Sequence, residues 1–109
     1  MYYIYMLRCK DNSLYTGITT DISRRMKEHF LKENKCAKYT FYHDALKLEK
    51  LWKTENRSLA SKLEFNIKKL NKSQKEKLIN DDQLFNELFA NCIDCDKYIC
   101  ISNKIEVYI

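Results

Sequence analysis

The chain contains no proline and a single glycine, Gly17, among its 109 residues. Proline and glycine make most tight turns in ordinary domains, so Asn, Asp and Ser must make the turns here. Gly17 lies inside a strand-like segment, where a missing side chain lets the backbone bend or lets another group approach closely. We therefore expect a chain built mainly of regular elements, with one special backbone position.

The first third of the sequence predicts a β-hairpin and then a helix. Residues 2–9 and 14–18 are rich in aromatic and β-favouring residues, and the Lys-Asp-Asn-Ser sequence between them is a turn signal. Thr20 or Asp21 can cap a helix that extends to about Asn34. The apolar stripe of this helix repeats every four residues and consists of Ile22, Met26 and Phe30.

The middle of the chain predicts a third strand and two more helices. Residues 35–43 have loop character, and residues 46–54 alternate apolar and charged residues as a strand does. Ser58 can cap a second helix, and the Ser-Gln-Lys-Glu sequence at 73–76 is a capping-box pattern that opens a third. The apolar face of the second helix consists of Leu59, Leu63, Ile67 and Leu70. The predicted order is β-β-α-β-α-α, an α/β chain of the α+β type.

The sequence changes character after Asn80, and we expect residues 1–80 to form the main domain and residues 81–109 an extension packed on it or appended to it. The extension is acidic and contains cysteines. Its apolar residues Leu84, Phe85, Leu88 and Phe89 predict a short helix. Residues 98–101 and 105–109 flank a turn sequence and predict a terminal hairpin or an added strand pair.

Charge is divided unequally between these two parts. Residues 1–80 hold 18 Lys and Arg against 9 Asp and Glu, whereas residues 81–109 hold 2 against 6. A positive field favours phosphate backbones through counterion release and speeds association with them. Nucleic acid is therefore the expected ligand of the first part, although many basic proteins bind none, and the acidic extension can serve as a docking element for a protein partner.

Other compositional signals concern the compartment. No apolar run approaches the roughly 20 residues that span a bilayer, and the first residues lack a signal-peptide pattern. Five cysteines at irregular spacing do not suggest a secreted disulfide framework, so we expect an intracellular protein with reduced thiols and no membrane partner. Cys92, Cys95 and Cys100 raise the question of zinc, but a closed zinc site needs a fourth ligand, and ordinary thiols are the favoured interpretation.

One set of polar and aromatic residues stands out along the first 70 positions. It consists of Tyr3, Tyr5, Tyr15, Gly17, Arg25, His29 and Glu64. Each has an ordinary explanation: Tyr3 and Tyr5 share a strand face as packing residues, Arg25 and His29 share a solvated helix face, and Glu64 pairs with Lys68 one turn later. Taken singly, these structural explanations are favoured.

Taken together and in order, these residues resemble the GIY-YIG nuclease family, in its small stand-alone branch. The resemblance covers residues 1 to about 80. The segments that carry it are residues 2–9 (YYIYMLRC), 13–21 (SLYTGITTD), 24–29 (RRMKEH), 37–40 (AKYT), and Glu64 followed by residues 67–70 (IKKL). It implies a three-stranded antiparallel sheet surrounded by helices, and tyrosine stands at position 3 where the family name has glycine.

The resemblance also implies roles for individual residues. Glu64 would hold one Mg²⁺ or Mn²⁺, and Arg25 would face the scissile phosphate in preference to its neighbour Arg24. Tyr5 and Tyr15 would line the pocket, with Tyr15 favoured as general base and His29 as the other candidate. The residues expected to contact DNA are Tyr3, Gly17, Arg24, Lys38, Lys68 and Lys69.

Two functions follow from this resemblance. The favoured one is a metal-dependent endonuclease that hydrolyses phosphodiester bonds in DNA during repair, recombination or the handling of foreign DNA. The alternative is a non-catalytic or partner-dependent DNA-binding module of a larger complex. One departure bears on substrate contacts, because residues 41–44 (FYHD) stand where relatives tend to be more basic.

Overall fold

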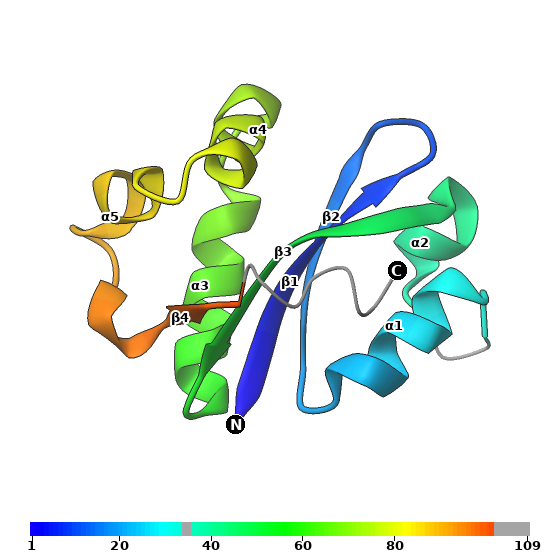
Figure 1. Ribbon diagram of the computed structural model, residues 1–109, viewed down its shortest axis with the longest axis horizontal. Coiled ribbons are helices and arrows are strands. Elements are labelled where there is room, and N and C mark those ends of the chain that lie inside the picture. The colour runs from blue at the N-terminus through cyan, green and yellow to red at the C-terminus, as the bar shows by residue number, and fades with distance from the viewer. Residues whose placement is uncertain (34–35, 102–109) are drawn as a thin grey trace.

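The computed structural model describes residues 1–33 and 36–101. A four-stranded antiparallel sheet lies between two groups of helices (Figure 1). The strands are β1 (Tyr2–Cys9), β2 (Leu14–Thr19), β3 (Ala45–Thr54) and β4 (Ile99–Cys100), in the spatial order β2-β1-β3-β4. The helices are α1 (Ile22–Phe30), α2 (Lys38–His43), α3 (Arg57–Lys68), α4 (Lys72–Asn80) and α5 (Leu84–Phe89), with a 3₁₀ turn at Cys95–Lys97.

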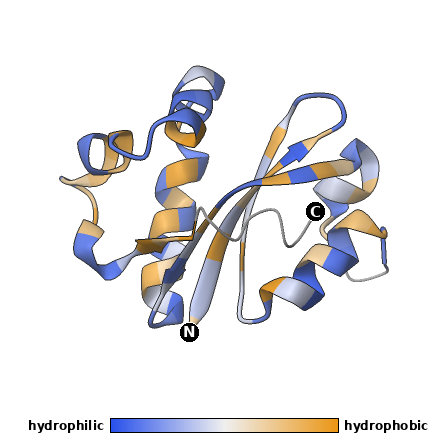
Figure 2. Cartoon of the chain, viewed as in Figure 1, coloured by the Kyte–Doolittle hydropathy of each residue, from blue (hydrophilic) through white to orange (hydrophobic). Residues whose placement is uncertain are grey.

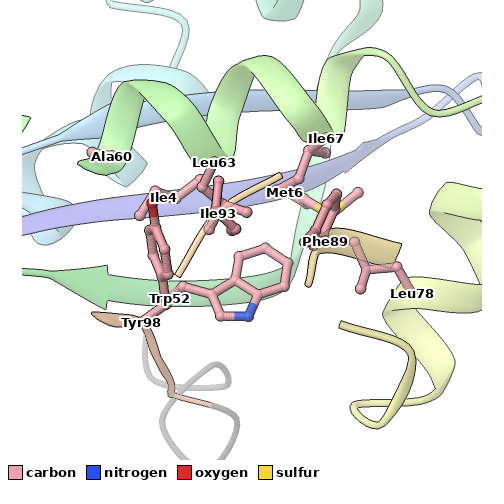
Figure 3. Close-up of a cluster of buried hydrophobic side chains, with 10 residues drawn as sticks. All are labelled: Ile4, Met6, Trp52, Ala60, Leu63, Ile67, Leu78, Phe89, Ile93 and Tyr98. Carbon is pink, nitrogen blue, oxygen red and sulfur yellow. The ribbon is translucent and has the colours of Figure 1, made fainter. Parts of the chain in front are cut away.

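Alternation along β1 divides the core between the two faces of the sheet. Ile4 and Met6 point to the face covered by α3, α4 and α5, where a cluster forms around Trp52 (Figure 3). Tyr5 and Leu7 point to the opposite face, and α1 covers them there with its own apolar residues. Figure 2 shows α3 alternating between apolar and hydrophilic residues, as expected for a helix with one side against a sheet.

The expectation of a three-stranded sheet is corrected by the structure. Ile99 and Cys100 pair with Lys53 and Trp52, so a short fourth strand lies along the otherwise open edge of β3. Main-chain groups on a sheet edge readily accept another strand, and this pairing satisfies part of that edge. The other tail strand, predicted at residues 105–109, lies outside the described residues.

The predicted loop at 35–43 is wrong for residues 38–43, which form helix α2. A six-residue helix is too short to be stable alone, and contacts with the rest of the fold stabilise this one. Helix α1 begins at its predicted cap, Asp21, but ends at Phe30, because Lys32 adopts a left-handed φ of 53°. Asn34, its predicted end, is outside the described residues.

Two other helix starts differ from prediction by two residues. Helix α3 is capped by Asn56, whose side chain accepts a hydrogen bond from Leu59 N–H, rather than by Ser58. Helix α4 is capped by Asn71, which forms a capping box with Gln74. In both cases asparagine provides the carbonyl oxygen that a helix start requires, and the neighbouring serine lies inside the helix.

Residues 81–101 contribute side chains to the α3 side of the sheet. Phe89, Ile93 and Tyr98 belong to the same buried cluster as Trp52, and the Tyr98 hydroxyl donates a 2.6 Å hydrogen bond to the carbonyl of Leu59. The helix predicted at 84–89 is confirmed as α5. Within residues 1–33 and 36–101, no helix has the length and apolar character needed to cross a membrane.

Candidate active site

Tyr5 and His29 meet on the α1 side of the sheet. Tyr5 comes from the central strand β1, and His29 from the last turn of α1, a helix held on the sheet by buried Ile22 and Met26. The Tyr5 hydroxyl lies 2.8 Å from Nε2 of His29, and Nε of Arg25 donates to the same hydroxyl at 3.3 Å. Both Tyr5 and His29 are almost completely buried.

Thr40 of helix α2 fixes the other side of the His29 ring. Its hydroxyl oxygen lies 2.7 Å from Nδ1 of His29 and donates its own proton to the carbonyl of Ala37 at 3.0 Å. A hydroxyl has one proton, so the oxygen of Thr40 must accept from Nδ1–H. The neutral imidazole then has a bare Nε2 that accepts the proton of Tyr5.

The protonation states of the pair follow from burial. Burial lowers the pKa of His29 to about 4, with the positive charge of Arg25 acting in the same direction. Burial also raises the pKa of Tyr5 above its ordinary value, while the hydrogen bond from Arg25 opposes that rise. At neutral pH the site therefore holds a neutral histidine and a protonated tyrosine in a fixed donor and acceptor order.

Arg25 is held by Glu28 as well as by Tyr5. Besides Tyr5, its guanidinium binds the buried carboxylate of Glu28 at 2.8 Å, and the pKa of Glu28 is lowered mainly by this hydrogen bond. Arg24 binds the other oxygen of Glu28 at 2.9 Å, but its side chain is 52% exposed against 20% for Arg25. Of the two arginines, the structure thus brings Arg25 to Tyr5 and leaves Arg24 outside.

Gly17 is the strand partner of Tyr5, and the tyrosine ring lies over it. A Cβ at this position would lie 2.5 Å from the Tyr5 hydroxyl oxygen and 2.7 Å from Cζ. Because the Tyr5 ring is buried and bonded to His29, it cannot move aside easily. The single glycine of the chain is therefore needed for space under the tyrosine, as the close-approach interpretation of the sequence predicted.

Tyr15 joins the same group through its ring. Its ring centroid lies 6.3 Å from that of Tyr5 and 5.6 Å from that of His29. Tyr39 of helix α2 stacks on Tyr15 at 5.6 Å, and Nζ of Lys68 lies 5.9 Å from the Tyr15 ring centroid. Tyr15 therefore connects the buried Tyr5–His29 pair with groups at the surface.

Glu64 approaches the site from α3, which packs against β2. Its carboxylate lies 3.2 Å from Nζ of Lys68, and its side chain is 24% exposed. Its charge is one of the influences that raise the pKa of Tyr5, after burial and the neighbouring Tyr15. Glu64 thus lies within electrostatic reach of the buried pair, with Lys68 between it and Tyr15.

The side chains around Glu64 limit the kind of metal that fits there. In the part of the chain that the structure describes, no three His, Cys, Asp or Glu side chains gather to hold one ion. A single partly exposed carboxylate fits a hard cation such as Mg²⁺ or Mn²⁺, which keeps several waters and would have to displace the Lys68 ammonium from Glu64. It does not fit a metal that needs four protein ligands.

The remaining predicted contacts lie around this centre. Lys68, Lys72 and Lys75 form a basic group between α3 and α4, since burial and the charges of the other two lysines lower the pKa of Lys75. Tyr3 packs with the buried residues on the Tyr5 face, Lys38 is exposed at the start of α2, and Lys69 lies against the ring of Phe65.

Three residues of the site were not singled out from the sequence. Glu28 lies three positions after Arg25 and four after Arg24, a helical spacing that could have indicated the double ion pair. The sequence indicates Thr40 and Tyr39 only as members of the segment at residues 37–40. Their contacts with His29 and Tyr15 are tertiary, and no local sequence signal predicts them.

Comparison with known proteins bears on this arrangement. A model of the GIY-YIG catalytic domain matches residues 1–77, which include Tyr5, Tyr15, Arg25, His29 and Glu64. The chain belongs to the GIY-YIG family. The resemblance predicted from the sequence is confirmed. The four-stranded antiparallel sheet and the helices of this chain form an α+β fold, as predicted.

The chain is also similar to small UPF0213 proteins from several bacteria. A UPF0213 protein of Fusobacterium nucleatum is 44% identical over 84 residues, which is 77% of this chain and 82% of the relative. One from Citrobacter koseri is 42% identical over 90 residues, 83% of this chain and 88% of the relative. The solution NMR structure of a UPF0213 protein from Bacillus halodurans shares 38% identity, with a TM-score of 0.48 over 73% of this chain and 84% of that chain.

Proposed function

We propose that this GIY-YIG chain is a divalent-metal-dependent endonuclease that hydrolyses phosphodiester bonds in DNA. The observation that carries the proposal is the ordered hydrogen-bond chain from Arg25 through Tyr5 to His29, with the carboxylate of Glu64 nearby. Membership of a catalytic domain family typical of nucleases supports the same conclusion. Hydrolysis of a phosphodiester needs a base, charge stabilisation and a stabilised leaving oxygen, and this group can provide them.

Arg25 is the residue proposed to bind the scissile phosphate. Its guanidinium is a planar fork of donors that remains charged. Burial acts to lower its pKa, but the hydrogen bonds to Glu28 and to the Tyr5 hydroxyl outweigh burial and raise the pKa above its ordinary value. Glu28 holds the guanidinium beside Tyr5, so the arginine does not have to be ordered when the substrate binds. Arg24 would then contact the backbone of DNA outside the reacting centre.

Tyr5 and His29 are proposed to act together as the base. When the attacking water loses a proton to the Tyr5 oxygen, the proton of Tyr5 can pass to the bare Nε2 of His29. The water becomes hydroxide, Tyr5 is again a neutral hydroxyl, and His29 becomes an imidazolium that Thr40 still holds through Nδ1–H. This order favours Tyr5 over Tyr15 as the proton carrier and leaves Tyr15 to line the pocket.

Glu64 would hold one Mg²⁺ or Mn²⁺, which when bound supplies Lewis acidity toward the phosphate oxygens and lowers the pKa of water. Lys68 pairs with Glu64, and its displacement by the cation would leave the ammonium beside Tyr15, next to the incoming phosphate. The basic group of Lys68, Lys72 and Lys75, with Lys69 and Lys38, would then bind the flanking DNA backbone.

The part of the chain after α4 is proposed to bind a protein partner. Glu87, Asp94 and Asp96 are exposed there and give residues 81–101 an acidic surface, which suits a basic partner rather than DNA. The cellular processes that fit an endonuclease of this kind are repair, recombination and the handling of foreign DNA.

The test is cleavage of labelled single-stranded, duplex and branched DNA by wild type and Glu64→Gln, each with Mg²⁺, Mn²⁺ or EDTA. We expect cleavage that needs the metal and falls by at least about 100-fold in the variant. Glu87→Gln, in the acidic part of the chain, is the matched control and should cleave as wild type. Salt-sensitive DNA binding with no cleavage in any metal would instead support the non-catalytic binding module.

A further inference from the structure

Helix α2 has a buried polar residue and two exposed aromatic residues. Thr40 is fully buried against His29, whereas Phe41 is 48% exposed and Tyr42 is 69% exposed. The two exposed rings lie edge to face, with centroids 5.2 Å apart. Leu31 and Leu46, on either side of α2 in the sequence, are exposed as well. Two adjacent exposed aromatic rings of this kind mark a candidate interaction surface.

This surface is continuous with the candidate active site. The Tyr39 ring stacks on Tyr15 and also on His43, and the Tyr39 and His43 centroids are 4.1 Å apart with the rings 20° from parallel. Tyr39 and Thr40 of α2 therefore contact Tyr15 and His29. The next two residues along the helix, Phe41 and Tyr42, are exposed. In Figure 1, α2 lies beside α1, the helix that provides Arg25 and His29.

Cationic groups accompany the exposed rings. Nζ of Lys32 lies 5.6 Å from the centroid of the Phe41 ring, and Lys38 is exposed at the start of the helix. Lys32 also pairs with Asp44, which orders it beside the ring. Flat aromatic faces next to ammonium groups match the chemistry of a nucleic-acid strand, whose bases stack and whose phosphates are negative.

The pairing state of the nucleic acid decides whether such rings can be used. In a duplex both faces of each internal base are covered by its neighbours, so a protein ring can stack only on a base that is unpaired or terminal. Duplex recognition would instead need a helix or polar side chains in a groove. A six-residue helix with two outward rings and a buried polar residue does not have that form.

We propose that Phe41 and Tyr42 stack on unpaired bases next to the bond that is cut, so that single-stranded DNA, or the single-stranded part of a branched DNA, is the preferred substrate. This inference rests on the proposed nuclease function and adds a substrate class to it. His43 and Tyr39 extend the stacked rings from α2 to Tyr15, along the path from the unpaired bases to the site.

The experiment measures binding of a fluorescent single-stranded oligonucleotide, and of the duplex of the same sequence, in EDTA so that no cleavage occurs. One variant is the double substitution Phe41→Leu and Tyr42→Leu, which keeps apolar side chains but removes both rings. The other is Tyr42→Phe, which keeps the ring. Ile99→Ala, which shortens an exposed apolar residue on β4, is the control. Thermal unfolding of each variant confirms that its fold is kept.

We expect the double leucine variant to lose about tenfold or more in single-strand affinity and less than about twofold in duplex affinity. Tyr42→Phe and Ile99→Ala should bind as wild type. Equal losses on both DNAs, or unchanged single-strand binding because α2 serves a protein partner, would overturn the inference. Absence of cleavage by wild type would count against the nuclease function alone, since binding in EDTA is measured separately.

Discussion

The hydroxyl of Tyr5 donates its proton to Nε2 of His29 across 2.8 Å and joins the central strand of the sheet to the last turn of α1. Both residues are buried, so the hydrogen bond lies in a medium of low polarity, where donor and acceptor order is strongly enforced. Arg25 donates to the same oxygen. The proposed catalytic groups are thus arranged before any substrate binds, which is the condition for effective electrostatic stabilisation.

Thr40 should determine the tautomer of His29. Thr40→Val keeps the shape of the side chain but removes the acceptor of Nδ1–H, and an unpaired buried donor costs about 1–3 kcal/mol of stability. Thr40→Ser should behave as wild type. Imidazole ¹⁵N chemical shifts report the tautomer directly. Retention of the Nδ1–H form and of wild-type stability in the valine variant would show that Thr40 does not position the ring.

The stability that neutral His29 provides should depend on pH. Its pKa of about 4 in the folded chain lies below the ordinary 6.5, so the unfolded chain binds more protons between these values. The contribution is present above about pH 6.5 and is lost as the pH falls towards 4. Urea unfolding of wild type and His29→Gln should therefore differ most near pH 7.5 and least near pH 4.5. A difference independent of pH would refute a neutral buried histidine.

Gly17→Ala should destabilise the fold by about 1–3 kcal/mol, because the new methyl group collides with the buried Tyr5 side chain. The closest approach is to the hydroxyl oxygen, so the same substitution should cost less when Tyr5→Phe has removed that oxygen. Chemical denaturation of the four chains of this cycle measures the coupling. Equal costs in both backgrounds would mean that Gly17 is needed for some other reason.

Arg8 should hold helix α4 to the sheet. Its guanidinium binds Glu49 at 2.8 Å and Glu76 at 2.5 Å, and all three side chains are partly or mostly buried. Arg8→Met leaves two carboxylates facing each other and should lower the free energy of unfolding by about 2–3 kcal/mol. Lys47→Ala, which removes a more exposed partner of Glu49 at 3.6 Å, should cost under about 1 kcal/mol.

The stability that the Arg8–Glu76 ion pair provides should depend on pH. Arg8 holds the pKa of Glu76 below its usual range, so the stabilisation is present above the ordinary glutamate pKa and is lost as the pH falls through the lowered value. The difference in free energy of unfolding between wild type and Arg8→Met should become smaller as the pH is lowered. A deficit that stays constant down to about pH 3 would argue against an electrostatic origin.

Elements with strong local signals could be predicted from the sequence. The first hairpin, the cap at Asp21 and helix α5 depend on β-favouring residues, a side-chain acceptor and apolar periodicity, all of which are local. Helix α2 could not be predicted, because it is too short to form without its neighbours. A strand was predicted at residues 98–101, where β4 lies, but its pairing with β3 could not be predicted. α2 depends on Thr40 and Tyr39 contacting α1 and β2, and β4 depends on the open edge of β3.

The candidate site was predictable to a similar degree. Motif spacing favoured Arg25 over Arg24, and the structure brings Arg25 to Tyr5. Spacing could not reveal the order of hydrogen bonds between Tyr5, His29 and Thr40, since these residues are 24 and 11 positions apart along the chain. That order is what favours Tyr5 over Tyr15 as the proton carrier, whereas the sequence favoured Tyr15 as the general base.

The most direct test of the account is a double-mutant cycle of single-turnover DNA cleavage with Tyr5→Phe, His29→Gln and both together. Tyr2→Phe, on the same strand but packed on the other face of the sheet, is the matched control. If the pair acts as one proton relay, each single change should lower the rate by about 100-fold or more, and the double variant should be no slower than the worse single variant. Losses that multiply, or single variants that cleave as fast as Tyr2→Phe, would contradict the relay.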